Sequence, residues 1–239
     1  MVLCPFHLQP VEEHSLSGET PAFLPNPRSL HLRYSRTHSN LPSYIHAPNL
    51  TELEIIEDPE DLFQIARMGK KTQTLSWLDG YGAQLTSFAF AACAALSKYE
   101  FIQCLSRLPM LEHLKILSQG ELVFHRNVMS HLRTHDICDL ALMDAEVLGL
   151  LAPGAEGDSE CLLPKLKSLD MKFDDDYPFG RESVVRFVEA RRRNLENRTE
   201  LVRICSQPQL PVTTGTWVEL ERSEVDLTDF KLILSPDIQ

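Results

Sequence analysis

The residues best suited to binding a metal ion are two histidines and a cysteine near the middle of the chain. His131 and His135 are four residues apart, so on a helix their imidazoles would share one face, and Cys138 follows. Imidazole nitrogen and thiolate sulfur are the ligands that zinc prefers. His135 nevertheless falls where a helix should give way to a strand, and further ligands would have to come from elsewhere. We therefore expect surface histidines here and no metal site.

Two runs of like charge could bind ions or docking partners. The three aspartates at positions 174–176 lack the glycine and glutamate that a calcium loop needs at fixed offsets, so a solvated acidic turn is expected. The three arginines at positions 191–193 could form a basic docking patch. Because Glu189 and Glu196 lie beside them, we expect these arginines to point into solvent from the wet face of a helix.

The chain carries no catalytic fingerprint. It lacks the G-x-S-x-G and H-E-x-x-H motifs, a phosphate-binding loop and a dinucleotide-binding glycine pattern. We therefore expect no enzyme activity, no catalytic residues and no cofactor. A hydrolase with a site at the loop ends stays as an alternative.

Composition narrows the classes of partner. The 239 residues carry a net charge of −11, which disfavours nucleic acid and anionic membranes as partners. No apolar run is long enough to span a bilayer, and the start of the chain lacks the pattern of a signal peptide. Six cysteines without a C-x-x-C pair indicate reduced thiols. We expect an intracellular protein, cytoplasmic or nuclear.

A recurring leucine pattern predicts the elements that would position any binding residue. Six segments repeat the spacing L-x-x-L-x-L with apolar residues: Pro27-x-x-Leu30-x-Leu32, Leu50-x-x-Leu53-x-Ile55, Leu85-x-x-Phe88-x-Phe90, Leu111-x-x-Leu114-x-Ile116, Ile137-x-x-Leu140-x-Leu142 and Leu166-x-x-Leu169-x-Met171. Their first positions are 23, 35, 26, 26 and 29 residues apart. Four of these five intervals fit the roughly 20–29 residues of a leucine-rich repeat.

The predicted fold is therefore an α/β leucine-rich-repeat solenoid of about six repeats, with a curved parallel sheet on the concave face and helices on the convex face. Residues 1–26 are expected to be an irregular lead-in or cap, residues 27–205 the solenoid, and residues 206–239 a C-terminal cap. Helices are predicted over residues 58–69, 72–79, 97–108, 122–132, 147–151 and 182–195. Strand-like segments at 201–205 and 216–220 would close the C-terminal end.

Four segments in order also carry a family resemblance. They are PNLTELEI at 48–55, WLDGYGAQLTSFAF at 77–90, LSKYEFIQCLSRLPMLEHLKI at 96–116 and VLGLLAPGAEGDSECLLPKLKSLDM at 147–171, followed by the helical VVRFVEARRR. Over roughly residues 27–205 the chain resembles the repeat region of fungal, mushroom-type F-box/leucine-rich-repeat proteins. The resemblance implies the substrate-recognition part of a ubiquitin-ligase adaptor. No F-box pattern of three helices is apparent before residue 27, so a ligase adaptor is expected as a partner only if an F-box lies outside this chain.

Alternation along the strands predicts which residues would bind a partner. Leucines point inward, and the residues between them form the concave surface, with small side chains in the middle and apolar ones exposed. A solvated face without a ligand is the alternative for any one position, and a stand-alone or truncated repeat scaffold is the alternative for the whole chain. The predicted protein-binding residues are Glu52, Glu54, Ile56, Ala89, Ala91, His113, Lys115, Leu117, Asp139, Ala141, Met143 and Asp170.

Overall fold

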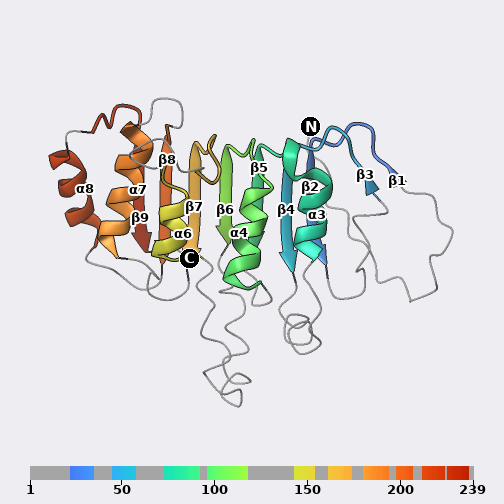
Figure 1. The fold of residues 1–239 in the computed structure, drawn as a ribbon, viewed down its shortest axis with the longest axis horizontal. Helices are drawn as coiled ribbons and strands as arrows, with labels where there is room; N and C mark the ends of the chain where they lie inside the picture. The colour runs from blue at the N-terminus through green and yellow to red at the C-terminus, as the bar shows by residue number, and fades with distance from the viewer. Residues whose placement is uncertain are drawn as a thin grey trace, which may run out of the picture.

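The chain forms an α/β structure around one seven-stranded parallel sheet (Figure 1). The computed structural model describes residues 22–34, 45–57, 73–91, 96–117, 143–153, 161–173, 180–193, 198–206, 212–223 and 225–236. Each strand of the sheet pairs with the next in sequence order. The strands are β2 (Ser29–Tyr34), β4 (Glu52–Glu57), β5 (Ser87–Ala91), β6 (His113–Leu117), β7 (Ser168–Phe173), β8 (Leu201–Ser206) and β9 (Lys231–Pro236). A separate parallel pair joins β1 (Ala22–Phe23) to β3 (Ile45–His46).

The described helices follow the strands in the same order along the sheet (Figure 1). They are α3 (Gln73–Tyr81), the 3₁₀ helix η1 (Gly82–Gln84), α4 (Lys98–Ser106), α6 (Ala145–Leu150), α7 (Arg181–Arg193) and α8 (Val212–Arg222). None of the helices in the described ranges has the length and apolar character needed to cross a bilayer.

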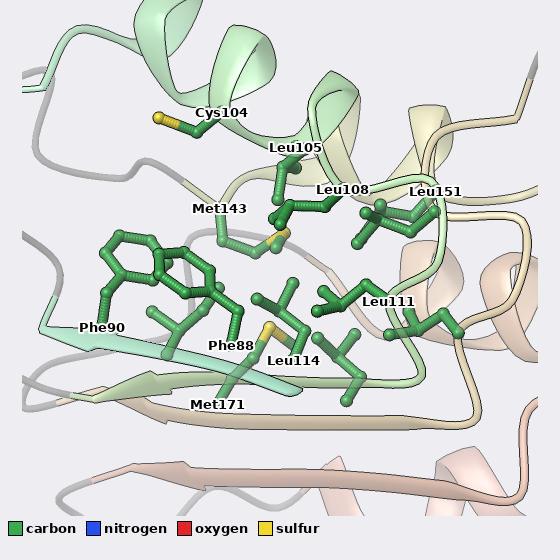
Figure 2. Packing of buried hydrophobic residues seen from close by; sticks show 14 of the residues in the cluster. Phe88, Phe90, Cys104, Leu105, Leu108, Leu111, Leu114, Met143, Leu151 and Met171 are labelled. Carbon is green, nitrogen blue, oxygen red and sulfur yellow. The ribbon is translucent and has the colours of Figure 1, made fainter. Parts of the chain in front are cut away.

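The core lies between the sheet and the helices, and the inward strand positions predicted from the leucine pattern supply it. Figure 2 shows Phe88, Leu114 and Met171 pointing from their strands toward Leu105 and Leu108 on the helical side. Neighbouring strands bring these positions into register, since Phe88 pairs with Leu114. Burial alternates along β4, β5, β6, β7 and β8 as expected. The inward residues at most 2 % exposed are Leu53, Ile55, Phe88, Phe90, Leu114, Ile116, Leu169, Met171, Val202 and Ile204.

The same hydrogen bond forms the turn before four of the strands. In each, a buried leucine donates its N–H to the carbonyl three residues earlier, at 3.1 or 3.2 Å. The four pairs are Leu50 to Ala47, Leu85 to Gly82, Leu111 to Leu108 and Leu166 to Leu163. At Gly82 the chain passes so close to α4 that an added Cβ would lie 2.5 Å from the carbonyl oxygen of Arg107. Glycine is required there because any side chain would displace backbone.

Several predicted helices are confirmed, with the caps that the sequence indicates. The Ser97 hydroxyl accepts the N–H of Glu100 at 3.3 Å, and the Glu100 carboxylate accepts the N–H of Ser97 at 2.9 Å, completing a capping box for α4. The predictions at 72–79, 147–151 and 182–195 correspond to α3, α6 and α7. Those at 58–69 and 122–132 lie outside the described residues.

One strand prediction is wrong, and another cannot be compared because the segment 137–142 lies outside the described residues. Among the described strands, β6 pairs directly with β7, with Lys115 opposite Asp170. The segment 216–220 is helical, within α8, because Trp217 and Leu220 also fit a helical spacing. The sheet instead continues through β9, inside the segment predicted as a C-terminal cap.

Candidate interaction surface

The face of the sheet opposite the buried core carries a continuous row of side chains from every strand. Pairing along the sheet brings one residue of each strand into line, at the position between the two inward ones. From β2 to β9 this row is His31, Glu54, Ala89, Lys115, Asp170, Arg203 and Ile233. None of the seven side chains is buried, whereas the inward residues on either side of them are buried from β4 to β8.

Two close polar contacts join neighbouring strands within this row. His31 Nδ1 lies 2.8 Å from Glu54 Oε2, and Arg203 Nη1 forms an ion pair with Asp170 Oδ2 at 3.1 Å. Lys115, between them, is exposed and has no ion pair in the described part of the chain. A second row, two residues earlier on each strand, contains the exposed polar side chains of Glu52 and His113. The surface therefore holds charges that are available to a partner.

Most of the predicted binding residues lie on this face. The structure brings together Glu52, Glu54, Ile56, Ala89, Ala91, His113, Lys115 and Asp170 on β4, β5, β6 and β7. Asp139 and Ala141 lie outside the described residues. Leu117 is the last residue of β6, and its side chain is not among those described.

The prediction that Met143 is exposed on this face is wrong. Met143 is only 1 % exposed and lies in the core near Leu108 (Figure 2). It directly precedes Asp144, whose carboxylate accepts the Val147 N–H at 2.9 Å and caps α6. Met143 therefore lies in the core just before the start of α6 and is not part of a strand.

The leucine pattern missed the part of the face formed by β8 and β9. Arg203 and Lys231 add positive charge there, and Leu201 and Ile233 add half-buried apolar surface. β8 was predicted only as a closing strand, and β9 was not predicted. The alternation Phe230-x-Leu232-x-Leu234 is the signal that could have revealed β9.

The prediction that Arg191 and Arg192 point into solvent is also wrong. Both side chains are buried, at 0 and 3 % exposure. Arg191 donates to the carbonyl oxygens of Leu162, Leu163 and Pro164, and Arg192 to those of Thr199, Asp226 and Thr228. Burial lowers the pKa of both guanidinium groups. These arginines hold the fold together and do not form a docking patch, whereas Arg193 is exposed as predicted.

Charged pairs beside the sheet tie successive elements together. Lys167 Nζ lies 2.9 Å from Glu112 Oε2; this bond lowers the pKa of the Glu112 carboxyl and raises that of Lys167. Lys98 Nζ lies 2.6 Å from Asp144 Oδ2 and also pairs with Glu146. Burial opposes ionisation of Asp144, but the bonds from Lys98 and from Val147 N–H outweigh it and leave the pKa lowered. These charges are already paired, so they are poor candidates for binding a partner.

Other sites in the described residues offer little chemistry. No group of histidine, cysteine and carboxylate side chains there could hold a metal ion, and His131, His135 and Cys138 lie outside those residues. Burial raises the pKa of the Cys161 thiol, which disfavours the reactive thiolate. An open pocket of 670 Å³ is lined by residues that include Arg28, Asn49 and Gln84, and Arg28 is the one charged side chain in its lining. The sheet face remains the strongest candidate.

No family model, curated protein or solved structure matches this chain. What it binds has to be inferred from the surface chemistry of the sheet.

Proposed function

We propose that the chain is a leucine-rich-repeat solenoid that binds a protein partner on the uncovered face of its sheet. Sequential parallel pairing of all seven strands and the turn shared by four of them support the repeat architecture. The observation that carries the functional proposal is the row from His31 to Ile233, which stays accessible along the whole sheet. Parallel sheets are usually covered on both faces. An exposed face whose side chains change in charge and size from strand to strand therefore favours binding.

The proposed role is similar to substrate recognition by an F-box ubiquitin-ligase adaptor. Such a module binds through an extended surface and needs no reactive side chains. The charged residues beside the sheet are paired with one another, which agrees with a binding role. A stand-alone scaffold without a ligase link would use the same surface. Co-purification of cullin-type ligase subunits would favour the adaptor role, and their absence would favour the scaffold.

A pair of alanine-to-arginine variants tests the binding surface. Ala89 lies in the middle of the sheet face, whereas Ala83 is exposed in η1, at the end of α3. In affinity capture followed by mass spectrometry, Ala89→Arg should remove a protein that wild type retains, because the long side chain blocks close approach. Ala83→Arg should retain it. Loss with Ala83→Arg and retention with Ala89→Arg would exclude the sheet face as the binding surface.

A further inference from the structure

We infer that the partner segment is bipolar: it places a cationic group over β4 and an anionic group over β6, with small uncharged residues between them. This inference rests on the proposed binding function of the sheet face and specifies the chemistry of its partner. The charges of the face change sign across β5. The net charge of −11 does not predict this division, which exists only on the sheet.

The acidic side of the face is β4. Glu52 is exposed, and Glu54 is half-buried with its carboxylate bonded to His31 at 2.8 Å. The bond to His31 fixes the orientation of the Glu54 carboxylate. Two carboxylates on the same strand, two residues apart, thus point out of the same face. They would attract a cationic group and repel an acidic one.

The basic side begins at β6. His113 and Lys115 are both exposed there, in the same two rows as Glu52 and Glu54. Beyond them Arg203 neutralises Asp170, and Lys231 on β9 adds another exposed cation. An anionic group of the partner would therefore meet Lys115, which has no carboxylate partner among the described residues.

The strand between these two sides is uncharged and small. Ser87, Ala89 and Ala91 are the outward residues of β5, and Ala89 lies between Glu54 and Lys115 in the register. Small side chains let a partner backbone approach the sheet closely. Two strand spacings separate β4 from β6, about 10 Å, and side chains on one face of an extended peptide lie about 7 Å apart at two positions and about 13 Å apart at four. A basic and an acidic residue two or four positions apart would therefore reach both sides.

A displayed library of random peptides, each about twelve residues long, tests the inference on the whole chain. The library is selected on wild type and depleted on Ala89→Arg, so that the retained peptides need the centre of the face. The retained peptides should combine Lys or Arg with Asp or Glu two or four positions apart, on the same face of an extended peptide. The charge exchange Glu54→Lys with Lys115→Glu should weaken their binding about tenfold or more, as close charge pairs at interfaces do.

A matched control exchanges two exposed charges away from the face and keeps the same net charge. Glu221→Lys with Lys165→Glu should leave peptide binding unchanged. Retained peptides that are apolar or of one charge sign would overturn the bipolar inference and leave the sheet face as the site. A library without any peptide sensitive to Ala89→Arg would overturn the proposed function itself. Self-association of wild type that Ala89→Arg abolishes, measured by sedimentation, would identify a second copy as the occupant and contradict the inference.

Discussion

The two halves of the molecule close the same kind of turn with different chemistry. Before β5 and β6 the turns are filled by leucines, and Leu85, Leu108 and Leu111 are completely buried. Before β7 the turn again contains a buried leucine, Leu166, but Arg191 of α7 binds the carbonyl of Leu163 there. Before β8 the matching position is Thr199, whose carbonyl accepts from Arg192. The first half, up to β6, therefore relies on apolar packing, and the second, from β7 on, adds charged hydrogen bonds to backbone.

This difference accompanies a difference in backbone conformation. The non-glycine residues with positive φ in the described ranges are Leu163 and Asp229, at 54° and 61°. Arg191 binds the carbonyl of Leu163 at 2.9 Å, and Arg192 binds that of Thr228, next to Asp229. A left-handed L-residue costs about 1–2 kcal/mol. We infer that the arginines stabilise conformations that leucine packing alone would not hold.

The largest effect should come from removing a leucine in the apolar half. Leu114 is 1 % exposed and pairs in register with Phe88 and Leu169. Leu114→Ala should lower the free energy of unfolding by about 2–5 kcal/mol, because it creates a cavity that the sheet cannot refill. Urea denaturation measures the loss. A decrease below about 1 kcal/mol would contradict the packing described for this half.

The apolar half is also the half that the sequence predicts best. Leu111-x-x-Leu114-x-Ile116 alternates strongly enough to predict the strand and its inward face, and Ser97-x-x-Glu100 predicts the capping box of α4. Five of the six strands predicted from the leucine pattern belong to the sheet, and the sixth, at 137–142, lies outside the described residues. The outward positions Ala89 and Lys115 followed from the same alternation, so most of the candidate surface was predictable.

The second largest effect should come from a buried arginine in the other half. Arg191→Met removes the Arg191 hydrogen bonds to the backbone carbonyls of Leu162, Leu163 and Pro164, although it also relieves the cost of burying a charge. We expect a net loss of about 1–3 kcal/mol, measured by urea denaturation. Arg186→Met on the same helix is the control. Its side chain is 79 % exposed and should change stability little.

The role of these arginines could not be read from the sequence. In VVRFVEARRR the arginines follow an apolar stripe, and charged side chains at such positions usually face solvent. What buries them is the arrival of distant backbone, at residues 162–164 and 226–228, whose carbonyls accept hydrogen bonds from the guanidinium groups. That arrangement depends on where β7 and β9 lie, which local periodicity does not specify. The same limit explains the error at Met143.

Thr199 tests the difference between the two halves at a single matched position in the turn before a strand. Its hydroxyl donates to the carbonyl oxygen of Leu166 at 3.0 Å, inside the core where leucine stands in the first half. Thr199→Val keeps the shape but leaves that carbonyl without this donor, so stability should fall by about 1–2 kcal/mol in urea denaturation. Thr86→Val is the control, because the Thr86 bond to Thr51 is only half-buried and water can replace it. Equal losses for both variants would contradict a polar closure specific to the second half.

The smallest effect should appear where the two halves meet, at Glu112 before β6 and Lys167 before β7. The bond from Lys167 lowers the pKa of Glu112 below its ordinary value of 4.5. A carboxyl with a lowered pKa stabilises the fold above its unfolded pKa, and this contribution is lost as the pH falls through the folded pKa. Both side chains are partly exposed, so solvent screens the pair and the effect is small.

Urea midpoints of wild type and Glu112→Gln should therefore differ slightly at pH 7 and converge as the pH falls below about 4.5. Glu221→Gln changes an exposed carboxylate with no ion pair in the described residues, so its difference from wild type should stay near zero across the same range. A difference between wild type and Glu112→Gln that grows on acidification would have the opposite sign to a stabilising Glu112–Lys167 pair. Sequential pairing alone, through the N–H groups of Lys167 and Ser168 to the Glu112 carbonyl, would then join the two halves at this point.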